Sequence, residues 1–232
     1  MRHVTVDDWS SQSGVLHQRD ARAKIIVLLT VLVTISFCSH PISFAALAAL
    51  LGTGVALSRA PLAGLSARVA ALLVFPLTFA GLIALTGDQD RALLLLVRSG
   101  LSLTAMLITV ATTPMPRFLT ALLWFGLPPM LVEVVQFVYR YLFVLGEEGW
   151  HMRTAAALRG GGRSLPAAAS TVGVLFGRAY GRAEGIHRAI ASRSFSGLMS
   201  APVRHRFTTS DAVFIAAVAS AALACFMFER VA

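Results

Sequence analysis

The stretch VAALLVFPLTFAGLIALT, residues Val69–Thr86, carries no charged side chain. A helix needs roughly 17–25 mainly apolar residues to cross the hydrocarbon core of a bilayer, so this stretch is long enough to span a membrane. A second long apolar stretch, Leu93–Thr113, follows after a short polar segment and ends at Pro114. Together the two stretches predict a pair of membrane-spanning helices joined by a turn.

The composition of the whole chain supports a membrane protein. Hydrophobic residues make up 56% of the chain and charged residues only 13%, whereas a soluble domain has about 25% charged residues. The net charge is +9, and many of the arginines lie between Arg153 and Arg206. A basic chain can indicate nucleic-acid binding, but long apolar runs favour basic cytoplasmic segments of a membrane protein. We therefore expect membrane lipid around the chain and no nucleic acid.

Three further apolar runs complete the pattern: Ile25–Ser39, Ile42–Ser58 and Ala212–Phe228. The expected fold class is an all-α membrane protein with about five transmembrane helices and long cytoplasmic helices. The count rises to six or seven if Met130–Leu145 and Ala167–Gly177 also cross. We expect three regions: a bundle of about four spans over residues 1–115, a membrane-proximal helical region over 116–210, and a last span over 211–232.

The distribution of basic residues predicts the orientation. Basic side chains precede the first run, lie between the second and third runs, and follow the fourth run: Arg19, Arg22, Lys24, Arg59, Arg68 and Arg117. Cytoplasmic loops of membrane proteins are enriched in Lys and Arg. The N-terminus is therefore expected on the cytoplasmic side.

The region after Pro116 is less apolar. Met130–Leu145 contains Glu133, Gln136 and Arg140, and a separate polar helix is expected from Gly146 to Arg159. The glycines at 160–162 should end that helix. Ser164 followed by Pro166 is typical of the start of a new helix, which should run to about Arg193. Glu184 and Arg188 have the spacing of an ion pair along that helix.

Motifs for catalysis are missing from the sequence. There is no GxxxxGK[ST] loop for ATP phosphates, no HExxH and no GxSxG. The first four apolar runs hold one ionisable residue, Arg98, and no acid, which disfavours an ion-coupled carrier. Histidine and glutamates at 147–151 fit solvated helix faces better than an active site. The N-terminal Met1-Arg2-His3 has donors for Cu(II) or Ni(II), but an ordinary histidine is the simpler interpretation. We expect no catalytic residue, cofactor or metal site in this chain.

Two short segments resemble each other. AAALRG covers residues 155–160 and AIASRS covers residues 189–194, so each places an alanine four residues before an arginine. Residues four apart share a helix face, which gives a flat patch beside a long cation. From the spacing alone, such a patch is either a docking surface for a partner or an arginine that fixes orientation.

Several longer stretches carry a resemblance to a known family. They are LHQRDARAKIIVLL (Leu16–Leu29), TTPMPRFLTALLWFGLPPMLVEVV (Thr112–Val135) and YRYLFVL (Tyr139–Leu145), in that order. Together they resemble the transmembrane T component of energy-coupling-factor (ECF) transporters, in the CbiQ branch associated with cobalt uptake. Ala21 stands where the opening motif of that family usually has proline.

The resemblance implies a role for the two alanine–arginine segments. In the family, two coupling helices dock on ATP-binding-cassette (ABC) ATPases through such segments. The residues that match are Ala155, Arg159 and Gly160 in the first segment, and Ala189, Arg193 and Ser194 in the second. Ser194 replaces the usual glycine, which makes the end of the second helix less certain to follow the pattern.

The resemblance also implies partners and a location. The expected partners are an ABC-type ATPase dimer and a CbiM-like substrate-capture (S) component, in some systems with a small accessory membrane subunit. The chain would be a multi-pass protein of the bacterial cytoplasmic membrane that transmits ATPase motion during metal-ion import, with cobalt as the expected cargo. A stand-alone polytopic cation carrier or channel is the alternative.

Overall fold

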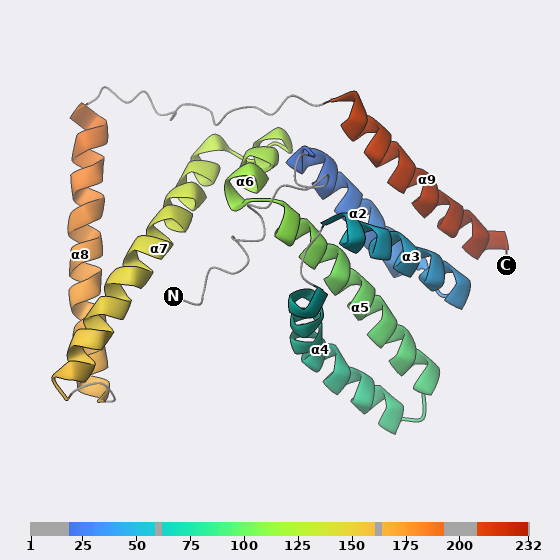
Figure 1. Ribbon diagram of the computed structural model, residues 1–232, viewed down its shortest axis with the longest axis horizontal. Helices are drawn as coiled ribbons and strands as arrows, with labels where there is room; N and C mark the ends of the chain where they lie inside the picture. Colours follow the sequence, from blue (N-terminus) through green and yellow to red (C-terminus); the bar gives the residue numbers. More distant parts are fainter. Residues whose placement is uncertain (1–18, 59–61, 161–163, 193–207, 232) are drawn as a thin grey trace. The chain divides into compact units, whose positions relative to one another are not determined.

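The chain folds into helices throughout the part that the computed structural model describes, residues 19–58, 62–160, 164–192 and 208–231. The helices are α2 (Ala21–Phe37), α3 (Pro41–Ser58), α4 (Leu62–Leu85), α5 (Gln89–Thr112), α6 (Met115–Trp124), α7 (Pro129–Leu158), α8 (Leu165–Ser192) and α9 (Thr209–Val231) (Figure 1). No strand occurs in these residues. The predicted all-α class is therefore confirmed.

Five of the described helices are long and apolar enough to cross a membrane: Pro41–Ser58, Gly64–Leu85, Gln89–Thr112, Pro129–Leu158 and Thr209–Glu229. The number agrees with the prediction, but the set differs from it. Helix α2 has only 17 residues, which lies at the lower limit for a span, whereas α7 qualifies. The chain is a multi-pass membrane protein.

The residues 1–121 and 205–232 form one compact unit, which we call the bundle. Within its described part, α2 packs against α5 and α9, α3 packs against the same two helices, and α4 packs along α5. The core between α2, α3, α5 and α9 is apolar and consists of Val31, Ile35, Cys38, Leu47, Leu51, Ala105, Ile108 and Val218. The last helix of the chain thus packs directly on the first described helix.

The residues 122–204 form a second compact unit, in which α7 and α8 pack on each other. We call these two helices the hairpin. The expectation of a separate polar helix from Gly146 is wrong, because α7 continues without interruption for 30 residues, or roughly 45 Å. A glycine inside a helix costs only about 1 kcal/mol relative to alanine, and neither Gly146 nor Gly149 has a positive φ angle. The pattern of polar residues marked a change of environment and not a helix end.

The turn of the hairpin follows the sequence prediction. Helix α7 ends at Leu158, and Gly160 has a φ angle of 81°, a conformation that glycine adopts without steric cost. The hydroxyl of Ser164 accepts a hydrogen bond of 3.3 Å from the amide of Ala167, which is the expected N-cap. Within α8, Arg188 and Glu184 form the expected ion pair at 3.8 Å.

Candidate functional site

The first alanine–arginine segment forms the C-terminal end of α7. Ala155, Arg159 and Gly160 are all exposed, and the amide of Arg159 closes the last turn by donating to the carbonyls of Ala155 and Ala156. Among the residues that the structure describes, the Arg159 guanidinium has no ion-pair partner. The end of α7 therefore exposes a small flat face at Ala155 and the positive charge of Arg159.

The second segment begins in the last turns of α8, where Ala189 is also exposed. Arg193 and Ser194 lie outside the described residues, so the prediction for them stays a prediction. The C-terminus of α7 and the N-terminus of α8 lie at the same end of the hairpin (Figure 1). Because α8 has 28 residues, it spans roughly 40 Å. Ala189 therefore lies near the opposite end of α8 from the first segment, and the hairpin does not bring the two together.

Two leucines beside the turn were missed by the sequence reasoning. Leu158 is 86% exposed and Leu165 is 85% exposed, although both are large apolar side chains. Leu158 stands directly before Arg159, so the turn combines an apolar surface with a cation. The available signal was Leu158 itself, an apolar residue at the end of a polar helix. The glycines that follow Arg159 have no side chains that could cover it. Exposed apolar residues that cluster at one place are typical of interaction sites.

The two helices of the hairpin are linked by a cluster of charges near the middle of α8. Arg178 of α8 donates a hydrogen bond of 2.7 Å to Glu148 of α7, and Arg182 lies 4.0 Å from the same carboxylate. The side chain of Glu148 is only 19% exposed, while that of Arg178 is 59% exposed. Next to them, Gly149 of α7 faces the side chain of Leu175 of α8. Charged residues thus link the two helices at this point.

Next to this cluster an apolar groove of about 510 Å³ lies between the helices, and Arg182 is one of the residues that line it. Phe137 and Tyr141 of α7 line one side, and Ile186 and Ile190 of α8 line the other. Few side chains of the hairpin are buried by the hairpin itself: among the described residues, only Val132 of α7 is buried, and no residue of α8. The hairpin therefore leaves a long apolar surface available to lipid or to another protein.

The remaining candidates from the sequence are placed as follows. His151 and Glu147 lie one turn apart on α7, 3.9 Å from each other, and both side chains are more than half exposed. No group of three or more metal-ligating side chains occurs in the described residues. Met1, Arg2 and His3 lie outside the described part. The positions of Glu147 and His151 agree with a solvated helix face.

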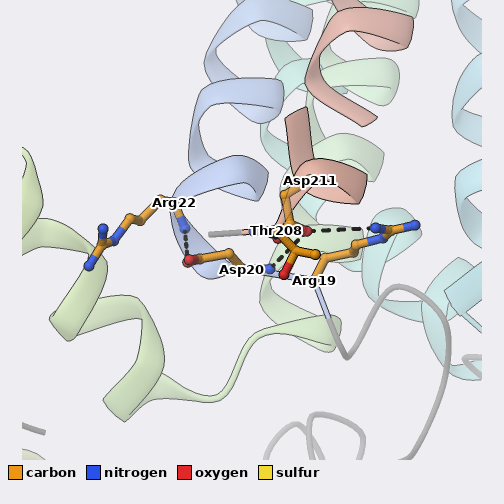
Figure 2. A network of polar contacts seen from close by, with 5 residues as sticks. All are labelled: Arg19, Asp20, Arg22, Thr208 and Asp211. Atoms are coloured by element: carbon orange, nitrogen blue, oxygen red, sulfur yellow. Dashed lines mark hydrogen bonds and ion pairs between the residues drawn. The ribbon is translucent and has the colours of Figure 1, made fainter. Parts of the chain in front are cut away.

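A polar network lies within the bundle at the start of α2 (Figure 2). The Asp20 carboxylate accepts a hydrogen bond of 3.0 Å from the amide of Arg22 and so caps α2. The amide of Asp20 donates to Oδ1 of Asp211, at 3.4 Å, and Arg19 lies 3.7 Å from the same oxygen. The other oxygen of Asp211 accepts a hydrogen bond of 3.1 Å from the amide of Thr208. One carboxylate thus caps α9 and binds the start of α2.

Lys24, the only lysine of the chain, extends this network to α5. It precedes the apolar part of α2 and is 5% exposed. Its ammonium donates to the carbonyl of Thr112 at 2.7 Å and to the hydroxyl of Thr113 at 3.3 Å. Burial is the main reason that the pKa of Lys24 falls from 10.5 to about 8. The charge of Arg117 acts in the same direction, while the carboxylates of Asp20 and Asp211 oppose it.

A second polar cluster lies at the other end of α9. The Glu229 carboxylate accepts hydrogen bonds from the amide of Ser39 at 2.6 Å, from the amide of His40 at 3.2 Å and from the hydroxyl of Ser43 at 3.1 Å. These groups precede or begin α3. Nearby, the Arg98 guanidinium donates to the carbonyl of Cys38 at 2.7 Å. The single ionisable residue of the first four apolar runs therefore satisfies the end of a helix.

A comparison with protein families identifies the chain. The model of the family described as cobalt transport protein, CbiQ, matches residues 12–203. The chain belongs to the CbiQ family. The match includes the opening motif at Asp20–Lys24, the hairpin and both alanine–arginine segments.

Two relatives illustrate the breadth of the CbiQ likeness. A cobalt transport protein CbiQ of Rhodobacter capsulatus is 34% identical over 92 residues, which is 38% of each chain. An uncharacterized protein of Methanocaldococcus jannaschii is 32% identical over 112 residues, which is 47% of this chain and 42% of the relative. The alignments thus cover less than half of the length of either relative.

Proposed function

We propose that this chain is the transmembrane scaffold and energy-coupling subunit, the T component, of an ATP-driven metal-ion importer of the ECF type, with cobalt as its cargo. The observation that carries the proposal is the hairpin, which exposes Ala155, Arg159 and Gly160 near the start of α8 and Ala189 near its end. Two sites separated by roughly 40 Å suit two ATPase subunits better than one. The chain itself has no phosphate-binding loop, so ATP would be hydrolysed by these partners.

In the proposed mechanism the ATPases move the hairpin. Arg159 and Arg193 would bind carboxylates or carbonyl groups of the ATPases, while Ala155 and Ala189 allow the helices to approach closely. Leu158 and Leu165 would add apolar contact at the turn. When the ATPases bind ATP and close, the two ends of the hairpin move, and its apolar groove would pass the motion to a membrane-embedded capture subunit. This arrangement requires the N-terminus and both alanine–arginine segments on the cytoplasmic side, as the basic residues predict.

Reversal of charge at both segments tests this proposal. We expect that the double change Arg159→Glu and Arg193→Glu removes co-purification of the ATPases with the tagged chain. Loss of one buried charge-paired arginine costs about 2–5 kcal/mol of binding free energy. The matched control is Arg153→Glu with Arg188→Glu, which makes the same change in net charge at exposed positions of the same helices and should leave the complex intact.

Two outcomes would contradict the proposal. The first is a double variant at residues 159 and 193 that keeps both its ATPases and metal uptake. The second is metal flux through liposomes that contain this chain alone, without ATPase or capture subunit, which would favour the stand-alone carrier. Uptake that requires all components and ATP is the expected result.

A further inference from the structure

One short segment of the bundle contacts the chain at two places. In the sequence, one place precedes the hairpin and the other follows it. The chain leaves α5 at Thr112 and Thr113, continues through α6, α7 and α8, and begins α9 at Thr209. The segment Arg19–Lys24 contacts the first of these places through Lys24 and the second through its first two residues. We call this segment the N-terminal clamp.

In the contact with α5, Lys24 supplies a hydrogen-bond donor to a carbonyl that has none within its own helix. The carbonyl of Thr112 belongs to the last turn of α5, where carbonyl groups have no partner within the helix. The chain then continues into Pro114, which has no amide hydrogen. The ammonium of Lys24 donates to this carbonyl at 2.7 Å, and Thr112 is only 1% exposed. A buried, charge-assisted hydrogen bond therefore fixes the point from which the chain leaves α5.

The contact with α9 is equally enclosed. Asp211 is 4% exposed, and its two oxygens bind different parts of the chain. Oδ2 accepts from the amide of Thr208 and so holds the first turn of α9. Oδ1 binds the amide of Asp20 and lies beside Arg19 (Figure 2). The start of α9 cannot shift relative to the clamp without separating a buried carboxylate from these groups.

We propose that Lys24 and Asp211 are positioning residues of transport, which make the chain on both sides of the hairpin move together with α2. This inference rests on the proposed function, because it takes the hairpin as the part that the ATPases move. Helix α2 packs against both α5 and α9. A displacement that arrives through either connection is then shared by three helices of the bundle. Without the clamp, the end of α5 and the start of α9 would each shift separately, and the motion would not be passed to α2.

The test measures metal ions taken up per ATP hydrolysed by the complete complex in proteoliposomes. The variants are Lys24→Met, which keeps the length of the side chain, Asp211→Asn, and the milder Thr113→Val. We expect Lys24→Met to lower the ratio about tenfold, as for the loss of one charge-assisted hydrogen bond, Asp211→Asn to lower it less, and Thr113→Val least. ATP hydrolysis should stay close to wild type. The controls Arg91→Met and Asp90→Asn change exposed residues at the start of α5 and should keep the ratio.

The outcomes separate this inference from the proposed function. A wild-type complex without ATP-dependent uptake would refute the proposed function. A working wild type combined with variants of unchanged ratio would overturn only the role of the clamp. The role would also be overturned if uptake and ATP hydrolysis fell by the same factor, or if all three variants failed to assemble, because the clamp would then serve folding alone.

Discussion

The bundle and the hairpin use long helices in opposite ways. Helix α2 buries seven residues against its neighbours, including Lys24, whereas the described residues of α8 include none that is buried. The acids that join helices differ in the same sense, because the side chain of Asp211 is 6% exposed and that of Glu148 is 19% exposed. In the bundle, the charged groups of Lys24 and Asp211 are buried and bind the ends of neighbouring helices. In the hairpin, most surfaces are left for other molecules, so its stability and its function depend on what covers it.

Among the changes that test this difference between bundle and hairpin, the largest effect is expected at Asp211. The change Asp211→Ala should lower the free energy of unfolding of the bundle by about 3–5 kcal/mol, because it leaves buried polar partners without their acceptor. Thermal unfolding of the purified chain in detergent measures the loss. The matched control is Asp90→Ala, an exposed acid in the first turn of α5, which should have little effect. Equal losses for both variants would contradict the inward role of Asp211.

A smaller effect is expected at Lys24, which should make the stability of the bundle depend on pH. The pKa of Lys24 falls from 10.5 to about 8 on folding. Between these two pH values, Lys24 has lost its proton in the folded chain but keeps it in the unfolded chain. The unfolded state then binds more protons, so stability rises as the pH increases from about 8 toward 10. Below about pH 8 the contribution of Lys24 is constant and at its lower level.

The measurement compares the melting temperatures of the wild type and Lys24→Met between pH 7 and 10. The difference between the two proteins should change with pH only above about 8. A difference that is the same throughout this range would show that Lys24 does not lose its proton there.

The smallest effect is expected in the hairpin, at Glu148. Because Arg178 is 59% exposed, solvent screens the pair, and Glu148→Gln should cost less than about 1 kcal/mol. The change should instead widen the distance distribution between spin labels at Leu131→Cys and Ala191→Cys, near the far ends of α7 and α8, with the native cysteines replaced. The control Glu184→Gln removes a pair within α8 and should leave the distances unchanged. A marked fall in stability for Glu148→Gln would mean that the hairpin resembles the bundle after all.

The sequence was sufficient for features that depend on neighbouring residues. Apolar runs predicted most of the helices, Gly160 predicted the end of α7, and Ser164 predicted the start of α8. These signals are local, because a span, a cap or an ion pair along a helix is defined by residues a few positions apart. The prediction at Gly146 was wrong because a change from apolar to polar residues does not by itself end a helix.

The long-range contacts could not be predicted in the same way. Asp20 and Asp211 are 191 positions apart, and Lys24 binds a backbone carbonyl, which every residue possesses. Hydrophobic periodicity identifies which residues turn inward but not which helices meet. The alanine–arginine segments were found as a pattern, whereas the exposure of Leu158 and Leu165 beside the first of them was established by the structure.

The position of Glu229 has a consequence for the order in which the protein is made. The amides of Ser39 and His40 emerge early from the ribosome, but the carboxylate that accepts their hydrogen bonds belongs to the last helix. The same holds for the amide of Asp20, whose acceptor is Asp211. The first helices therefore lack these partners until α9 is inserted, and the bundle reaches its final packing only after synthesis of its C-terminal segment.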